Sequence, residues 1–398
     1  MRQRETEMTM SGQAGKPFTF DAVPSMHMEW STSRRLGELL AGWFEQRNLL
    51  IVTDKGLHGT GVLEPAKASL EAAGFSVTVF DDVVADPPES VLLACVGVGK
   101  TAGIDIMLGL GGGSSMDVAK LAAVLVPSAQ ELSELYGIGK VRGRRLPLVQ
   151  MPTTAGTGSE ATNITILTTG DTTKMGVVSQ QLHADRVVLD AELTCGLPPL
   201  HTAATGIDAM VHAVEAYTGK YKKNPLSDVF AREALRLLSA NLIPACQNGT
   251  DRAAREAMLL GANLAGQAFS NSPVGAVHAL AYPLGGHFHV PHGLSNALML
   301  APVLRFNMTA AAPLYAELAD LLLGGRDEGM QGRSAAFVEH MQGLIDDSGA
   351  PRRLRDVGVR EDSLPVLAAD AMKQTRLLVN NPAELTEWDA LTLYQEAF

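Results

Sequence analysis

The feature of this 398-residue chain that most restricts its fold is a change in hydrophobic periodicity about halfway along. In the first half, short apolar runs rich in β-branched residues, such as 49–54 and 76–83, alternate with segments of helical spacing. Such alternation is typical of crossover units and predicts a mainly parallel sheet. In the second half, apolar residues recur at i, i+3 and i+4 without a convincing strand pattern. We therefore expect an α/β N-terminal domain with a Rossmann-like parallel sheet at residues 1–198 and an all-α C-terminal domain at residues 199–398.

Composition excludes several classes of protein. Thirty-two basic against 43 acidic residues give a net charge of −11, which is unfavourable for binding nucleic acid. No uninterrupted apolar stretch reaches the ~18 residues of a membrane span, and the polar N-terminus lacks the apolar region of an export signal. The three cysteines are scattered without CxxC spacing, which argues against a disulfide framework or a thiolate metal site. We expect a cytoplasmic enzyme that binds neither nucleic acid nor a membrane.

A glycine-rich turn is the most informative feature of the first half. Residues 104–126 predict a strand, a turn with three consecutive glycines at 111–113, and a helix that opens on Ser114 and Ser115. Such a turn lets backbone amides approach a phosphate, whose charge also suits a helix N-terminus. The alternative is a glycine-rich connection without a ligand. Because consecutive glycines weaken a purely structural turn, we favour phosphate binding.

Two further polar features follow predicted strands. After the strand ending at Met151 come Thr153, Thr154, Thr157 and Ser159, whose hydroxyls can bind a ribose, a phosphate or a nicotinamide amide. Those hydroxyls can equally cap their own backbone turns. Asp54 ends an earlier strand, where a carboxylate can accept both adenosine ribose hydroxyls and repel a 2′-phosphate, or act as an ordinary helix cap. The ribose-binding interpretation of Asp54 favours NAD over NADP.

One segment imitates a nucleotide-triphosphate loop. Residues 94–101 (ACVGVGKT) place Gly99, Lys100 and Thr101 in register with that motif, but Ala94 replaces its first glycine. The residues that lead into it, PESVLLACV, have a helical pattern and a strand follows it, whereas the motif follows a strand and precedes a helix. We therefore do not expect an ATPase.

The second half supplies side chains that suit a metal ion. Asp208 and His212 are four residues apart and project from one face of a predicted helix, where burying them is costly unless something pairs with them. One carboxylate and three neutral imidazoles form a suitable ligand set for a divalent transition metal. Spacing alone does not select which two of the later histidines would complete it. The candidates are His278, His287, His289 and His292.

At these residues the chain resembles the iron-containing (group III) alcohol dehydrogenase family, from about residue 48 to the C-terminus. The matching segments are GGGSSMDVAK (111–120), MPTTAGTGSEAT (151–162), LTCGLPP (193–199), ATGIDAMVHAVEAY (204–217), KKNPLSD (222–228) and HALAYPLGGHFHVPHGLSNALML (278–300). The resemblance implies a dehydroquinate synthase-like architecture. It also implies NAD(H) and Fe²⁺ as cofactors, with Zn²⁺ possible on the same ligands, and a homodimer or larger homo-oligomer.

The resemblance also assigns roles to individual residues. It implies Asp208, His212, His278 and His292 as the metal ligands, so that His287 and His289 are not ligands. The residues it places at NAD are Asp54, Gly112, Gly113, Ser114, Ser115, Met116, Thr153, Thr154, Thr157, Thr162 and Lys174.

The sequence departs from the family pattern at two places. Most relatives carry a further histidine four residues after the third ligand, often given a proton-relay or substrate-facing role, and here that position is Tyr282. A phenol, with a reference pKa near ~10, is a poor base unless the cation lowers its pKa. We place Tyr282 in the pocket lining, where it could hydrogen-bond the substrate, as the candidate catalytic residue. The family also has a glycine-rich turn before its first helix, whereas residues 22–36 contain no glycine.

These features predict a metal-dependent alcohol dehydrogenase or aldehyde reductase that transfers a hydride between a small primary alcohol and NAD. Fe²⁺ would bind the alcohol oxygen as a Lewis acid. An alternative is a maleylacetate reductase-type enzyme of the same fold, a branch that generally lacks the intact ligand set. Another is a catalytically silent protein that binds NAD or a metal on the same scaffold.

Overall fold

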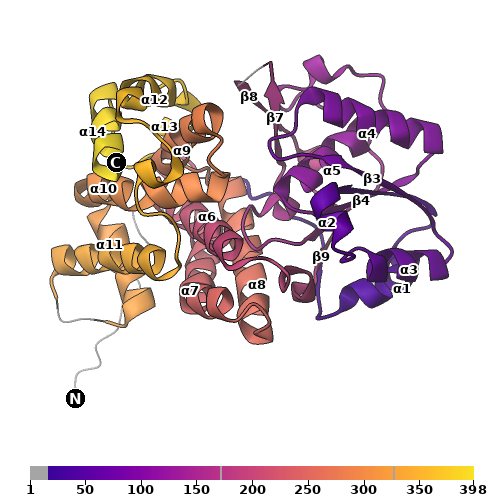
Figure 1. Cartoon of the computed structure of the whole chain (residues 1–398), viewed down its shortest axis with the longest axis horizontal. Helices are drawn as coiled ribbons and strands as arrows, with labels where there is room; N and C mark the ends of the chain where they lie inside the picture. Colours follow the sequence, from indigo (N-terminus) through magenta and orange to yellow (C-terminus); the bar gives the residue numbers. More distant parts are fainter. Residues whose placement is uncertain (1–16, 171–172, 326–327) are drawn as a thin grey trace.

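The N-terminal lobe is built on a parallel sheet. The computed structural model describes residues 17–170, 173–325 and 328–398, which form a strand-containing lobe and a helical lobe (Figure 1). The larger sheet has six strands in the order β1-β9-β6-β4-β2-β3, and every neighbouring pair is parallel. These strands are β1 (Met26–Met28), β2 (Asn48–Asp54), β3 (Ser76–Val83), β4 (Ile106–Gly111), β6 (Leu148–Pro152) and β9 (Arg186–Leu189). The predicted parallel sheet is confirmed.

Helices cover both faces of this sheet, and β2 shows why the sequence produces that arrangement. Leu49 and Ile51 belong to one buried cluster, whereas Leu50 and Val52 belong to the other. Successive strand residues point to opposite faces, so a strand buried on both faces must be apolar throughout. The helices between these strands are α1 (Leu36–Trp43), α2 (Lys55–Gly59), α3 (Glu64–Ala72), α4 (Glu89–Ala102) and α5 (Gly113–Leu125). The segment that imitates a nucleotide-triphosphate loop lies inside α4, as its helical pattern predicted.

Sequence patterns did not reveal several short strands. A second sheet joins β5 (Gly137–Ile138), β8 (Thr173–Val178) and β7 (Ile164–Thr169) in the order β5-β8-β7, with β7 and β8 antiparallel. In the large sheet, β1 and β9 have three and four residues. The strands β1, β5 and β9, with two to four residues, are too short for a periodicity to be recognised, whereas β7 and β8 have six residues each and were also missed.

The turn after β1 forms without a glycine. Ser31 itself adopts the left-handed conformation, with φ of 63°. The Asp190 carboxylate accepts hydrogen bonds from the amides of Ser31 and Ser33 at 2.9 and 2.8 Å. These bonds to a charged acceptor offset the cost of the backbone conformation.

The C-terminal lobe is helical throughout its described residues. β9 ends at Leu189, a 3₁₀ turn follows at Ala191–Thr194, and the first long helix starts at Pro199. The helices are α6 (Pro199–Thr218), α7 (Pro225–Gln247), α8 (Arg252–Asn271), α9 (Ala276–Phe288), α10 (His292–Leu323), α11 (Met330–Asp347), α12 (Leu364–Ala371), α13 (Thr375–Leu378) and α14 (Glu387–Ala397). The all-α prediction is confirmed, and the division at residue 198 stays a prediction.

Within the described residues, α10 is the one helix long and apolar enough to cross a membrane. Its most apolar stretch is 61% buried inside the protein, and it packs against α6, α9 and α11 (Figure 1). α10 is therefore a core helix.

A buried histidine in the N-terminal lobe predicts an acid-sensitive stability. Burial, with a smaller effect of the Lys120 charge, lowers the pKa of His183 to about 4, and neither ring nitrogen has a hydrogen-bond partner among the described residues. The unfolded chain binds that proton at its ordinary pKa of about 6.5, so the free energy of unfolding falls as the pH falls from about 6.5 to about 4, by about 3 kcal/mol. Urea titrations should show this loss in the wild type and a smaller one in His183→Gln. The exposed-site control His201→Gln should behave as the wild type, and equal pH slopes for all three proteins would contradict the assignment.

Candidate metal centre and cofactor cleft

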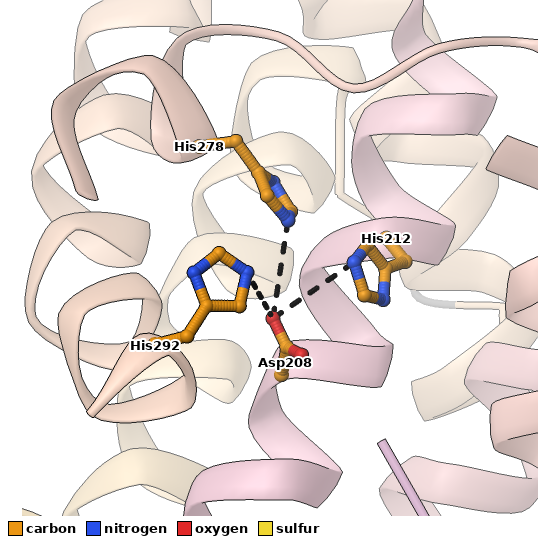
Figure 2. Close-up of side chains that lie close together, drawn as sticks. All are labelled: Asp208, His212, His278 and His292. Carbon is orange, nitrogen blue, oxygen red and sulfur yellow. Dashed lines mark ion pairs between the residues drawn. The ribbon is translucent and has the colours of Figure 1, made fainter. Parts of the chain in front are cut away.

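Three helices bring four metal-ligating side chains together. Asp208 and His212 lie one turn apart on α6, His278 lies in the first turn of α9, and His292 is the first residue of α10. The side chains converge on one point from these three helices (Figure 2). Pro291 precedes α10 with an extended backbone, so the helix begins at the residue that faces the cluster.

The geometry of the cluster fits one divalent cation. The Asp208 Oδ1 atom lies 3.9 Å from the Nε2 atoms of His212 and His278 and 3.6 Å from that of His292 (Figure 2). One ligand atom from each of the four residues lies within 4.8 Å of the others. Bonds of about 2.1 Å in a tetrahedral site place ligand atoms about 3.4 Å apart. Around an ion, the distances from Asp208 to the histidines therefore need to shorten by up to about 0.5 Å and the widest separation in the cluster by up to about 1.4 Å.

Protonation states in the cluster also suit a metal. Burial lowers the pKa of His212 to about 3, so its imidazole is neutral at physiological pH. Burial alone would raise the pKa of Asp208, but the neighbouring histidines and the Asn296 amide lower it overall, so this carboxylate is ionised. A carboxylate and neutral imidazoles are the forms that bind a cation.

Two further side chains orient the ligands. Glu215, one turn beyond His212 on α6, accepts from the Val277 amide at 2.7 Å, and its other oxygen lies 2.7 Å from His278 Nδ1. The amide nitrogen of Asn296 donates to Asp208 Oδ1 at 2.6 Å. A carboxylate on the far nitrogen of a metal-binding histidine fixes its tautomer and raises its basicity. Sequence reasoning missed both residues, although each is a polar residue at helical spacing from a ligand on an apolar helix.

The cluster opens into a cavity between the lobes, of about 1240 Å³ including its mouth. Its lining includes all four candidate ligands and Tyr282, together with part of the predicted cofactor loops. The predicted cofactor residues on this lining are Gly113, Ser114, Thr157, Thr162 and Lys174. The remaining ones, which do not line it, are Asp54, Gly112, Ser115, Met116, Thr153 and Thr154.

The glycine turn fits a phosphate group. α5 has no side-chain cap, and among the described residues the amides of Gly113 and Ser114 have no hydrogen-bond partner. A Cβ atom on Gly113 would lie 2.9 Å from the side chain of Thr157, so a larger residue would close the approach. Ser115 and Met116 are buried, and the Met116 amide donates to the Gly112 carbonyl. Open amides at the start of a 13-residue helix attract an anion.

The threonine loop is held in place by a buried ammonium group that sequence reasoning missed. Lys120 is fully buried on α5. Its Nζ atom donates to Ser159 Oγ at 2.8 Å, Thr162 Oγ1 at 3.0 Å and the Ile164 carbonyl at 2.8 Å. Asp117 Oδ1, 3.2 Å away, balances its charge. Lys120 therefore ties α5 to the loop at residues 153–162 and to β7.

Of the other predicted residues, Asp54 and Lys174 have local partners. Asp54 Oδ1 accepts from the Leu57 amide at 2.9 Å, which makes it the N-cap of α2. Lys174 forms an ion pair of 2.7 Å with Asp86 and donates to Thr168. Tyr282 lies four residues after His278 on α9 and lines the cavity, and burial raises the pKa of its phenol. His287 pairs with Asp370, away from the cluster, and stays a non-ligand.

Comparisons with known proteins agree with this geometry. The profile "Iron-containing alcohol dehydrogenase" matches residues 24–191, and the profile "Fe-containing alcohol dehydrogenase family, C-terminal" matches residues 202–398. Long-chain-alcohol dehydrogenase 1 of Geobacillus thermodenitrificans is 40% identical over 88% of this chain and 90% of its own length. Sulfoacetaldehyde reductase of Bilophila wadsworthia is 37% identical over 91% of this chain and 96% of its own. A solved 1,3-propanediol oxidoreductase aligns with a TM-score of 0.92 at 33% identity, over 96% of this chain and all of that chain.

Proposed function

The chain belongs to the iron-containing alcohol dehydrogenase family, whose members are NAD-dependent oxidoreductases, and from this premise we propose a specific reaction for it. It transfers a hydride between NAD(H) and a small primary alcohol or the corresponding aldehyde. Similar proteins are named for long-chain alcohols, for sulfoacetaldehyde and for 1,3-propanediol. The chemistry these names share is the interconversion of a primary alcohol and an aldehyde.

The observation that carries this proposal is that one cavity is lined by both the ligand cluster and the start of α5. If the phosphates of the cofactor lie against Gly113 and Ser114, the rest of the cofactor can extend into the cavity that the ligand cluster also lines. The cleft between two lobes also limits the access of water. Neither a silent scaffold nor the maleylacetate reductase branch, which generally lacks the intact ligand set, explains a complete cluster in that place.

The residues have distinct roles in the proposed reaction. Asp208, His212, His278 and His292 hold Fe²⁺, with Zn²⁺ possible on the same donors, and a divalent ion in that site supplies Lewis acidity toward an alcohol or carbonyl oxygen. Glu215 fixes the His278 ring. Because its pKa is raised, the Tyr282 phenol keeps its proton and donates a hydrogen bond into the cavity.

On the cofactor side, the amides of Gly113 and Ser114 bind the pyrophosphate, and the Thr157 and Thr162 side chains border the cavity beyond it. The two loops run from Gly112 to Met116 and from Thr153 to Thr157, and their remaining residues shape the turns. The homodimer or larger assembly and the cytoplasmic location stay predictions.

Isotope transfer tests the proposed reaction. Mixing the Fe²⁺-loaded protein with NADH deuterated at C4 and a panel of short aldehydes should bleach the nicotinamide absorbance and place deuterium on C1 of the alcohol. Absence of turnover with every aldehyde, with either metal, would reject the dehydrogenase function.

Asp54 provides a test of cofactor choice. Asp54→Asn keeps an oxygen that can accept from the Leu57 amide but removes the negative charge expected to bind the ribose hydroxyls and repel a 2′-phosphate. We expect the ratio of kcat/KM for NADH over NADPH to fall about 10-fold or more in this variant, the scale of one or two hydrogen bonds to a charged group. A wild type that already prefers NADPH, or an unchanged ratio in the variant, would contradict the role of this carboxylate.

A further inference from the structure

One charged group on the cavity lining, the exposed Arg376, is not required for hydride transfer. Arg376 lies on α13 and lines the same cavity as the four candidate metal ligands. Within the described part of the chain its guanidinium has no carboxylate or carbonyl partner. We propose that Arg376 binds the anionic head group of the substrate, and that the preferred substrate is a short aldehyde carrying a carboxylate or sulfonate at its far end. This inference rests on the proposed function of the same cavity.

The other charges on the cavity wall are already matched. Lys174 is neutralised by Asp86 at 2.7 Å, and Asp117 is matched by the buried Lys120 at 3.2 Å. Asp208 belongs to the metal cluster and would be outweighed by a divalent ion. Among the described lining residues, Arg376 therefore supplies an uncompensated positive charge that favours an anion over a neutral molecule.

A hydroxyl donor lines the same cavity as this guanidinium. Tyr282 follows His278 by one helical turn on α9, and its hydroxyl has no hydrogen-bond partner among the described residues. Leu377, next to Arg376, packs in a small apolar cluster with Val274 and Tyr282, which fixes α13 against α9. A guanidinium and a phenol together offer the planar and single donors that an oxyanion accepts.

The distance along α9 limits the length of the substrate. Four residues of α-helix rise roughly 6 Å, so Tyr282 stands about that far from the ligand His278. Apolar side chains, including those of Phe269, Val274 and Val290, also line this cavity. A short carbon chain between a carbonyl at the metal cluster and an oxyanion at Arg376 fits this succession of charged, apolar and charged groups.

Matched substrates test the role of Arg376. The probes are 4-oxobutanoate, its neutral methyl ester and the sulfonate 3-oxopropane-1-sulfonate, each reduced with NADH by the metal-loaded protein. In Arg376→Gln we expect kcat/KM for both anions to fall about 10- to 100-fold, the effect of losing charge-assisted hydrogen bonds, while the value for the ester changes less than about twofold. Arg376→Lys should recover part of the loss for the anions. Arg353→Gln, which removes an exposed arginine outside the cavity lining, should match the wild type.

A binding measurement separates head-group recognition from chemistry. Titration of the NADH-loaded protein with 4-hydroxybutanoate forms a complex that cannot react, and its Kd should rise about 10- to 100-fold in Arg376→Gln. Equal losses for the anions and the ester in Arg376→Gln, or a raised KM for NADH alone, would overturn the role of Arg376. Reduction of the ester by the wild type would in either case leave the proposed function intact. A loss confined to one anion would show that Arg376 binds the head group of that anion and not of the other, and it would still support the role of the guanidinium. Failure of all three aldehydes in the wild type would instead reject the proposed function.

Discussion

Asp208→Asn is expected to remove tight metal binding and to lower the rate of aldehyde reduction by about 10³-fold or more. The substitution keeps the size of the side chain but removes the negative charge that three imidazoles surround at 3.6 to 3.9 Å. Without that charge the site offers only neutral donors to the cation. Metal content after dialysis and the rate of NADH oxidation measure the two effects.

A matched histidine provides the control for this prediction. His287→Ala removes an imidazole that pairs with Asp370 and does not belong to the ligand cluster. We expect it to retain the metal content and activity of the wild type, whereas His212→Ala should lose both. A fully active Asp208→Asn protein, or equal losses in His287→Ala, would contradict the assignment of ligands.

Lys120→Met is expected to lower the free energy of unfolding by about 3–5 kcal/mol, the usual cost of breaking a buried ion pair from one side. The substitution leaves Asp117 without its cation and removes the donor that Ser159, Thr162 and the Ile164 carbonyl share. Burial lowers the pKa of Lys120 and the Asp117 charge opposes this, so the ammonium form depends on its partner. Urea titration measures the loss.

An exposed lysine shows what a surface ion pair contributes. Lys67 on α3 lies 3.9 Å from Glu71, and Lys67→Met should cost less than about 1 kcal/mol. The double variant Lys120→Met/Asp117→Asn should recover part of the loss, because it no longer leaves a buried carboxylate unpaired. A loss in Lys120→Met no larger than in Lys67→Met would show that the buried network does not stabilise the fold.

How far the sequence predicts this structure depends on the length of each element. The run at residues 49–54 and the glycine turn at 111–113 are local signals, because strand burial and turn conformation depend on neighbouring residues. Short elements such as β1 depend on partners more than 100 residues away, in this case β9, and their own sequences carry little pattern. The left-handed Ser31 is a further example, since Asp190, the residue after the neighbouring strand β9, stabilises it.

The candidate site divides in the same way. Asp208 and His212 could be identified because both lie on one predicted helix, and resemblance supplied His278 and His292, which the structure brings to the same cluster. Glu215 was not identified because its role exists only once α9 brings His278 against α6. Lys120 and Arg376 were missed for the same reason, since their partners or surroundings belong to other elements.

The central claim is that a divalent ion held by Asp208, His212, His278 and His292 enables reduction of an aldehyde by NADH. Its most direct test is to titrate the metal-free protein with Fe²⁺ without oxygen, in the presence of NADH and a short aldehyde. We expect the rate of NADH oxidation to start near zero, rise in proportion to added metal and level off at one ion per chain, with no such rise in Asp208→Asn. A metal-free protein as active as the loaded one, or an equal response in Asp208→Asn, would contradict the claim.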